Sequence, residues 1–232
     1  MHISALTVCV GYSDFLEKSL ACWIRNCDRI IIVTDLDDEQ TPNLIVEHDS
    51  PKVDCYRTNK FYQNGATFNK AAAICWAIES HGMTGCDCAP WLNDWQLFFD
   101  SDIIPQGNWR EVFEQHAPQI GNLYGAKRYL EDGNMFNENE LAGYFQIFHA
   151  TDEHVFGRNP LLQTNWAHAG GYDSEFHQRW EEREKIYLPI RLVHQGLPGE
   201  NWWGKGQIEK MEYMKQKRRE CDGIWEGERV KR

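Results

Sequence analysis

Short apolar runs that end in polar residues alternate with helical patterns through the first half of this chain. The predicted strands are residues 3–10, 29–34, 53–57 and 96–99. Between them, apolar residues at helical spacing predict helices over 13–23 and 67–79. Strands that alternate with helices favour a mostly parallel sheet joined by right-handed crossovers. The expected fold class is therefore α/β, with a mixed, mostly parallel sheet flanked by helices.

The alternation becomes less regular beyond residue 105. The predicted elements are a helix over 109–116, strands over 122–129, 142–149 and 186–193, a charged helix over 180–185, and a basic helix after a glycine-rich loop at 196–206. No internal repeat or linker divides the chain. We therefore expect a single domain over 1–232, in which the second half elaborates the first.

Composition narrows the class of protein. The chain has 232 residues, of which 42% are hydrophobic, and this is ample for a packed core. A formal net charge of -11 argues against a general nucleic-acid-binding surface. The stretch from Lys205 to Arg232 is much more basic than the rest. A solvated helix face is the favoured interpretation of that stretch, and a nucleic-acid-binding arm is the alternative.

Eight cysteines are scattered along the chain, several of them inside apolar segments. No signal peptide precedes the first strand, and no segment approaches the length of a membrane span. We therefore expect free thiols, a cytoplasmic protein and no transmembrane segment. His81, Cys86 and Cys88 are a candidate zinc site. Their spacing fits no common zinc pattern, so an ordinary loop is favoured.

Two aspartates one residue apart follow the apolar run at 96–99. Side chains at i and i+2 of an extended strand point to the same side, so Asp100 and Asp102 can converge on one hard cation. A bare Asp-x-Asp is more often a solvated loop. Here it follows a strand that is apolar enough to be buried, and open α/β sheets bind ligands at the carboxyl ends of such strands. The position favours a metal and phosphate site.

Polar loops also follow the first two strands and would lie at the same edge of the sheet. Gly11 and Tyr12 follow the first strand, and Asp35 follows the second. Adjacent strand ends of this kind form nucleotide sites, in which polar groups contact the base and ribose. Lys70 stands near the start of its helix, where it and the helix N-terminus can meet a phosphate. An ordinary surface lysine is the competing interpretation.

Several short motifs follow one another along most of the chain. They are Tyr-Ser-Asp-Phe-Leu at 12–16, Val-Thr-Asp at 33–35, Phe-Asn-Lys at 68–70, Asp-Ser-Asp-Ile-Ile-Pro at 100–105 and Gly-Tyr-Phe-Gln-Ile-Phe-His at 143–149, continued by segments at 172–180, 194–196 and 201–204. In this order they resemble the motifs of nucleotide-sugar glycosyltransferases of GT-A fold, and more narrowly a family 2-like group. Tyr172 stands where similar proteins have serine, and the Glu-Asp pair of many family 2 enzymes is absent in clear form.

The resemblance implies a GT-A, Rossmann-like domain with a nucleotide-binding half at 1–105 and an acceptor half at 106–232. It implies Mn²⁺ or Mg²⁺ as the metal and a nucleotide-diphospho-sugar, a UDP-sugar first, as the donor. The implied metal ligands are Asp102 as the main one, with Asp100 and His194. The implied nucleotide- and donor-binding residues are Gly11, Tyr12, Asp35, Asn69, Lys70, Asp100, Gln146, Trp202 and Lys205. Without the resemblance, a histidine that follows a strand is more often a structural residue than a metal ligand.

An acceptor hydroxyl must lose a proton as it attacks, so an inverting enzyme needs a base opposite the metal. Asp173 is the first candidate because the preceding glycines allow the chain to bend, and Glu175 is the second. The alternative is that Asp173 caps a short helix. Tyr144, Gln146 and His149 are expected to share one face of a predicted strand, which could line the sugar or acceptor site, and an ordinary half-buried strand is the equal alternative. Trp202, in its glycine-flanked loop, could cover the donor, and a core tryptophan is the alternative.

The leading hypothesis is thus a metal-dependent glycosyltransferase, and its acceptor is open. The resemblance extends loosely to enzymes that glucosylate hydroxymethylated pyrimidines, so double-stranded phage DNA in the host cytoplasm is one acceptor. A saccharide, a lipid-linked glycan or a protein is equally admissible. Two other classes compete with this hypothesis. A nucleotidyltransferase would need a glycine-rich basic loop after the first strand, and a non-catalytic binding module would show no turnover.

Overall fold

The computed structural model describes residues 1–80, 94–137, 141, 143–166, 169–196 and 227–229. The helices are α1 (Ser13–Asn26), α2 (Gln40–His48), α3 (Lys70–Ser80), α4 (Trp109–Gln115) and α5 (Tyr172–His177), with short 3₁₀ segments η1 (Lys60–Gly65) and η2 (Glu182–Glu184). The strands are β1 (Ile3–Val8), β2 (Arg29–Thr34), β3 (Val53–Thr58), β4 (Trp95–Phe99), β5 (Ile103–Pro105), β6 (Leu123–Leu130), β7 (Met135–Asn137), β8 (Phe145–His149), β9 (Lys185–His194) and β10 (Gly227–Arg229).

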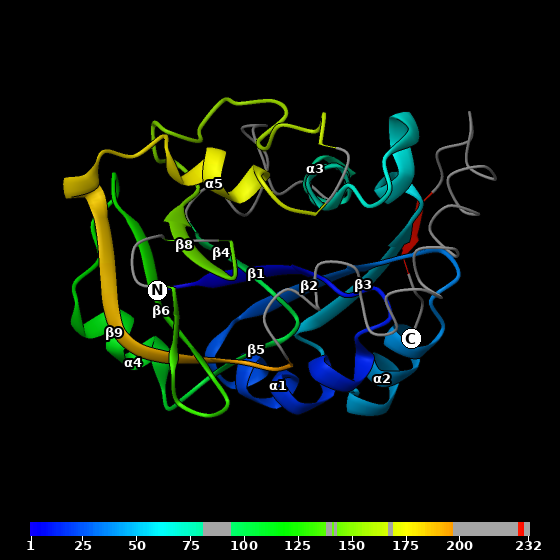
Figure 1. Ribbon diagram of the computed structural model, residues 1–232, viewed down its shortest axis with the longest axis horizontal. Coiled ribbons are helices and arrows are strands. Elements are labelled where there is room, and N and C mark those ends of the chain that lie inside the picture. The colour runs from blue at the N-terminus through cyan, green and yellow to red at the C-terminus, as the bar shows by residue number, and fades with distance from the viewer. Residues whose placement is uncertain (81–93, 138–140, 142, 167–168, 197–226, 230–232) are drawn as a thin grey trace.

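One sheet carries all of these strands. Its order is β10-β3-β2-β1-β4-β8-β6-β9-β5, with β7 paired to β6 (Figure 1). Strands β3, β2, β1 and β4 are parallel neighbours, so their carboxyl ends meet at one edge. Strand β8 runs antiparallel to both of its neighbours, β4 and β6. Strand β6 therefore runs in the same direction as β4, and so does β9, which pairs with β6 in parallel. The ends of β4 and β9 therefore point the same way.

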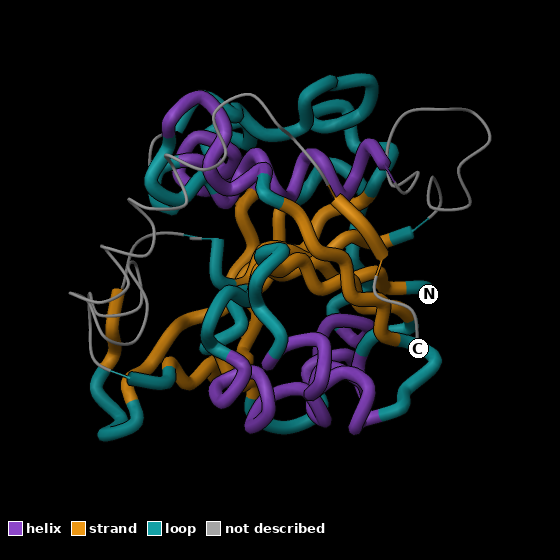
Figure 2. The backbone as a smooth tube through the Cα atoms, turned by 90° about the vertical axis from the view of Figure 1, so that its right-hand side faces the viewer, coloured by secondary structure: helices purple, strands orange, loops and turns teal. Residues whose placement is uncertain are grey.

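Helices cover both faces of the sheet, as Figure 2 shows. Helices α1, α2 and α4 lie on one face, and α3 and α5 lie on the other (Figure 1). The first face buries Leu16, Leu20 and Trp23 of α1 against alternate residues of β1 and β2. The second face buries Ala73 and Ile74 of α3 against the other set of alternate residues of β1 and β2. This is the expected three-layer α/β arrangement, with a mixed sheet that is parallel through its first half.

Helix α2 was not predicted, although a residue in the preceding loop explains it. The Asp38 carboxylate accepts hydrogen bonds from the backbone N–H groups of Gln40 and Thr41, at 3.0 and 3.1 Å, and so caps the first turn. Its other oxygen accepts from Thr34 Oγ1 at 2.6 Å and from Gly11 N at 3.1 Å. The predicted acidic loop after β2 thus leads directly into a helix. Its Asp38 also links this loop to the loop after β1 by hydrogen bonding.

Other predicted boundaries change because of local hydrogen bonding. The helix expected over 67–79 begins at Lys70, since Asn69 Oδ1 accepts from Ala72 N at 2.9 Å and caps it. The charged helix expected over 180–185 is wrong: only the single 3₁₀ turn η2 forms, and β9 begins at Lys185. The basic helix expected after the glycine-rich loop lies mostly outside the described residues. Within it, Gly227–Arg229 forms strand β10, antiparallel to β3.

The described cysteines are free and buried. Burial raises the pKa of the Cys9 thiol to about 12 and that of Cys75 to about 11, so both thiols are neutral at physiological pH. In the part of the chain that the structure describes, no helix is both long and apolar enough to cross a membrane. His81, Cys86 and Cys88, the candidate zinc site, lie outside the described residues.

Candidate functional site

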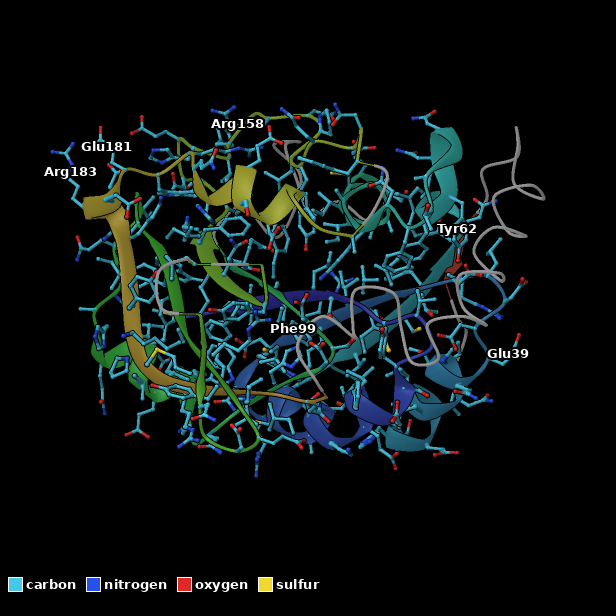
Figure 3. All side chains as sticks on the ribbon, in the orientation of Figure 1. Glu39, Tyr62, Phe99, Arg158, Glu181 and Arg183 are labelled. Atoms are coloured by element: carbon cyan, nitrogen blue, oxygen red, sulfur yellow. The ribbon has the colours of Figure 1, made fainter. Side chains whose placement is uncertain are left out.

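The Asp-Ser-Asp segment forms a turn between β4 and β5. Ile103 N donates to Asp100 O at 3.2 Å and closes the turn. Asp100 N donates to Tyr144 O at 3.3 Å, which continues the β4–β8 ladder by one residue. The strand before it is buried throughout, so the turn projects from the interior of the sheet, next to the buried Phe99 (Figure 3). The sequence prediction of two carboxylates at the carboxyl end of a buried strand is confirmed.

Strand β9 brings His194 to this turn. The antiparallel pairing of β5 with β9 aligns Ile103 with His194, and Gln195 N donates to Asp102 O at 2.9 Å. As a result, His194 Nε2 lies 3.3 Å from Asp102 Oδ2. His194 is 4% exposed and Asp102 is 9% exposed, so each is shielded from bulk water. Two of the three predicted metal ligands are therefore adjacent.

Asp100 has a different partner. Its Oδ1 forms an ion pair with Lys70 Nζ at the first residue of α3. The ammonium also lies 5.7 Å from the centre of the Tyr172 ring. Burial opposes the charge on Lys70, but Asp100 and Tyr172 outweigh it and raise the pKa of Lys70. Lys70 is thus a half-buried, paired cation within the site and not an ordinary surface lysine.

Arg128 on β6 is a site residue that the sequence did not reveal. Its guanidinium lies 4.4 Å from the centre of the Tyr144 ring. Burial lowers the pKa of Arg128, and the negative charges of Asp100, Asp102 and Asp173 act against that effect. Arg128 therefore stands in the field of all three carboxylates. The only sequence signal was a basic residue near the end of a predicted strand, which is common on protein surfaces.

Asp173 lies in the first turn of α5, after the N-cap residue Gly171. Its Oδ2 accepts from Gly143 N at 3.0 Å. A Cβ added at Gly143 would lie 2.6 Å from the Asp173 Cβ, so only glycine permits this approach. Asp173 does not cap α5 as the alternative supposed, and its other oxygen accepts no hydrogen bond from the described part of the chain.

Glu175 lies away from this cluster. Residues two apart on a helix do not face each other, so Asp173 and Glu175 point to different sides of α5. The charge of Asp173 acts on Arg128 and Tyr172, whereas that of Glu175 acts on Arg179. Asp173 is therefore the candidate base that shares a cluster with the Asp-Ser-Asp turn.

Two predicted binding residues serve the structure around the site. Asn69, which caps α3, also donates from Nδ2 to Thr164 O at 2.7 Å. Gln146 is fully buried and donates from Nε2 to Leu141 O at 2.7 Å. The prediction that Gln146 and His149 share a face of their strand is wrong, because residues three apart on a strand point to opposite faces. His149 packs edge-on against Trp95 in the α1-side core.

The other predicted nucleotide-binding residues lie at the ends of β1 and β2. Gly11 has φ 66°, a conformation that favours glycine, and its N–H is engaged by Asp38. Tyr12 stacks on Phe15 with ring centroids 5.8 Å apart. Asp35 is 1% exposed, and its carboxylate accepts from the Tyr62 hydroxyl and from Asp37 N. Tyr62 lies on the η1 side of the molecule in Figure 3, far from Glu181 and Arg183.

The donor set fits a divalent cation that is completed by a ligand. Among the described residues, no group of three His, Cys, Asp or Glu side chains is arranged to hold a metal ion alone. Asp102 and His194 supply one oxygen and one nitrogen donor side by side. Mg²⁺ and Mn²⁺ sites often use one or two protein ligands together with substrate phosphates and water, so two donors suffice. Trp202 and Lys205 lie outside the described residues.

Comparison with known proteins gives the fold. No protein-family model matches the chain, and no curated protein matches it. A crystal structure of a mycobacterial protein has 13% identity and a TM-score of 0.52, covering 93% of this chain and 71% of that chain. A structure described as a glucose-1-phosphate thymidylyltransferase from Bacillus anthracis, in complex with a sucrose, has 9% identity and a TM-score of 0.50, covering 94% and 95%.

A third structure has a lower TM-score. It is glucosyl-3-phosphoglycerate synthase from Mycobacterium tuberculosis in complex with Mn²⁺, uridine diphosphate and glucosyl-3-phosphoglycerate, with 13% identity and a TM-score of 0.49 over 93% of this chain and 76% of that chain. The first two likenesses show the fold alone, and they confirm the expected Rossmann-like α/β class.

Proposed function

We propose that this protein is a metal-dependent glycosyltransferase that moves a sugar from a nucleotide-diphospho-sugar to a hydroxyl acceptor. The observation that carries the proposal is the approach of His194 Nε2 to Asp102 Oδ2 at 3.3 Å, with Lys70 and Arg128 beside the same turn. Transfer of the sugar leaves negative charge on the departing diphosphate. Two donors for a cation and two half-buried cationic side chains are what such a leaving group needs.

Each residue has a task in this proposal. Asp102 and His194 would hold Mn²⁺ or Mg²⁺, which when bound neutralises charge on the diphosphate. Lys70 and Arg128 would supply positive charge to the diphosphate, which stabilises the leaving group. The loops at Gly11–Tyr12 and Asp35 would take the nucleoside, with uridine as the first candidate. Asp173 would accept the proton of the acceptor hydroxyl, which corresponds to an inverting transfer.

The proposal also includes the class of acceptor. We take a hydroxymethylated pyrimidine in double-stranded DNA as the first acceptor to test, with a saccharide, a lipid-linked glycan and a protein as the other arms. DNA binding by a chain of net charge -11 would have to use a local basic surface. Comparing DNA nucleosides by mass spectrometry, with and without the protein expressed, separates the DNA arm from the others.

A nucleotidyltransferase remains the competing class, because the Bacillus anthracis structure carries that description and shares the fold. The β1 loop disfavours it. A nucleoside triphosphate would need free backbone N–H groups there. In this protein Gly11 N donates to the Asp38 carboxylate, and Asp14 adds a further negative charge at the start of α1.

The test is a panel of nucleotide sugars with Mn²⁺, in which release of the nucleoside diphosphate is measured. We expect UDP release from a UDP-sugar, and its loss by about two orders of magnitude or more in Asp102→Ala, because the leaving group loses its cation. Glu47→Ala, an exposed change on α2, is the control. Inorganic diphosphate release from a nucleoside triphosphate and a sugar phosphate would instead establish a nucleotidyltransferase. UDP release and Mn²⁺ binding that survive Asp102→Ala unchanged would refute the metal assignment.

A further inference from the structure

The ion pair of Lys70 and Asp100 stands beside the proposed cation site. The side chain of Lys70 is 12% exposed and that of Asp100 is 30% exposed. Tyr172, buried at the start of α5, lies beside the same ammonium, with its ring centre 5.7 Å from Lys70 Nζ. The cation is therefore fixed between three elements: the β4 turn, the start of α3 and the start of α5.

The positive charge of Lys70 opposes the binding of a divalent metal ion nearby. Asp100 and Asp102 belong to the same turn, so the charge state of the Asp100 carboxylate would affect a divalent ion held by Asp102. While Lys70 neutralises Asp100, that carboxylate contributes little attraction to the ion. In a partly buried site, a unit charge a few ångströms away changes a binding constant by more than a factor of ten.

We propose that Lys70 is a resident counter-cation that keeps Asp100 from binding the divalent metal until a diphosphate draws the ammonium away. This inference rests on the metal site of the proposed function. A diphosphate is doubly or triply charged, and bound near the N-terminus of α3 it would compete well with one carboxylate for Lys70. Asp100 then becomes available to the cation. Metal and nucleotide would consequently bind cooperatively, each strengthening the other by the same factor.

The experiment measures Mn²⁺ binding directly, by titration calorimetry and by the electron paramagnetic resonance signal of free Mn²⁺, with and without UDP. In Lys70→Met without UDP, we expect Mn²⁺ to bind at least about ten-fold more tightly than to the wild type, because Asp100 is no longer neutralised. We also expect the factor by which UDP strengthens Mn²⁺ binding to be smaller in this variant than in the wild type.

Three further variants make the result specific. Lys70→Gln removes the charge and keeps a hydrogen-bond donor, and it replaces the methionine variant should that one fail to fold. Lys185→Met is the matched control: the Lys185 side chain is 10% exposed and its ammonium pairs with Glu182 at the opposite end of β9, so Mn²⁺ affinity should not change. Adding Asp100→Asn to Lys70→Met should abolish the gain in affinity, because the gain comes from the freed carboxylate.

Unchanged or weaker Mn²⁺ binding in both Lys70 variants overturns the inference, as does a gain that persists in the double variant. These outcomes are separate from those of the proposed function. If nucleotide sugars turn over in an Asp102-dependent way but Lys70→Met and Lys70→Gln bind Mn²⁺ like the wild type, only the counter-cation inference fails. If no nucleotide sugar turns over but the affinity gain appears and depends on Asp100, only the proposed function fails. If Mn²⁺ binds to none of the variants, both fail.

Discussion

The first turn of α5 separates the two carboxylates that the sequence offered as first and second candidate base. Asp173 accepts from Gly143 N and shares the electrostatic environment of Arg128, while Glu175 acts on Arg179. The helical repeat is the reason, because it turns side chains two residues apart to different sides. The proposed base must stand within reach of the acceptor hydroxyl, and of the two carboxylates Asp173 is the one that shares the cluster of the Asp-Ser-Asp turn.

Replacing the proposed base tests this assignment. In Asp173→Asn, we expect kcat to fall by about 10² to 10⁴-fold, the usual contribution of a general base, while the Kd for UDP in the presence of Mn²⁺ stays within about three-fold of the wild type. Glu175→Gln is the control and should leave kcat nearly unchanged. Steady-state kinetics and calorimetry give the two quantities. An equal loss of kcat in both variants would remove Asp173 from the mechanism.

Asp28 is a second residue whose environment makes a prediction, this time about stability. It lies just before β2 and accepts from Ile3 N at 2.9 Å and from Arg110 Nη1 at 3.0 and 3.1 Å. Burial by itself would raise the pKa of Asp28, but these hydrogen bonds and the Arg110 charge bring it below the ordinary value. A lowered folded-state pKa means stability that is present above the unfolded-state pKa and is lost as pH falls through the folded-state pKa.

Asp28→Asn should therefore lower the free energy of unfolding by about 2 kcal/mol at pH 7, since hydrogen bonds to a charged group are lost. The difference from the wild type should shrink as pH falls below the unfolded-state pKa of about 4, and it should vanish only below the lowered folded-state pKa, where the wild-type carboxyl is itself protonated. Urea unfolding at each pH measures it. Glu17→Gln, exposed on α1, should show no such pattern. If the difference in free energy of unfolding between the wild type and Asp28→Asn stayed constant with pH, the charge-based explanation would be wrong.

At the scale of elements, α2 and the β1 loop depend on one side chain. Asp38 accepts from Gln40 N and Thr41 N at the start of α2, and from Gly11 N in the loop after β1. A helix start leaves N–H groups without intrahelical partners, so a capping carboxylate stabilises the helix. The same contact holds the proposed nucleoside-binding loops together, which joins the stability of α2 to the shape of the site.

We expect Asp38→Ala to lower the free energy of unfolding by about 2 kcal/mol, since it removes a cap and leaves neighbouring donors unsatisfied. Amide hydrogen exchange should quicken at Gly11 and at the first residues of α2. Exchange in α4, which has its own cap at Asn108, should remain as in the wild type. Uniform acceleration over all helices would show that the effect is not local to the cap.

One continuous sheet runs through the described part of the molecule, so the two halves of the chain, 1–105 and 106–232, share a core. The central strand β4 pairs with β1 of the first half and with β8 of the second. Its residues are all buried, and Phe99 packs against Trp23 at 4.1 Å between ring centroids. Phe98 contacts Phe148 of β8 at 5.1 Å. The core therefore spans the boundary near residue 105.

A fragment of residues 1–105 should consequently fail to fold by itself. Removing β8 exposes one edge and part of both faces of β4, and each large apolar side chain exposed costs about 1.5 to 3 kcal/mol against a total stability of about 5 to 15 kcal/mol. Far-UV circular dichroism and amide NMR dispersion of the fragment, beside the full chain, measure the outcome. A fragment with native-like dispersion and a cooperative melt would show that the first half is an independent domain.

Local pattern alone determined the α/β class, most of the strands and the position of Asp100 and Asp102 at a strand end. Hydrophobic periodicity and strand-end polarity are local properties, so they survive without knowledge of the fold. Helix α2 was missed because its cap, Asp38, stood within a run of acidic residues that indicated only a loop.

The tertiary structure alone decided the partners within the site. The β5–β9 register sets His194 against Asp102, the packing of α3 sets Lys70 against Asp100, and β6 adds Arg128. These pairings join residues far apart in sequence. They depend on which strands become neighbours and in what register, and that is set by burial of the whole core. The two aspartates that look equivalent in the sequence therefore differ in the fold: one faces a histidine and the other faces an ammonium.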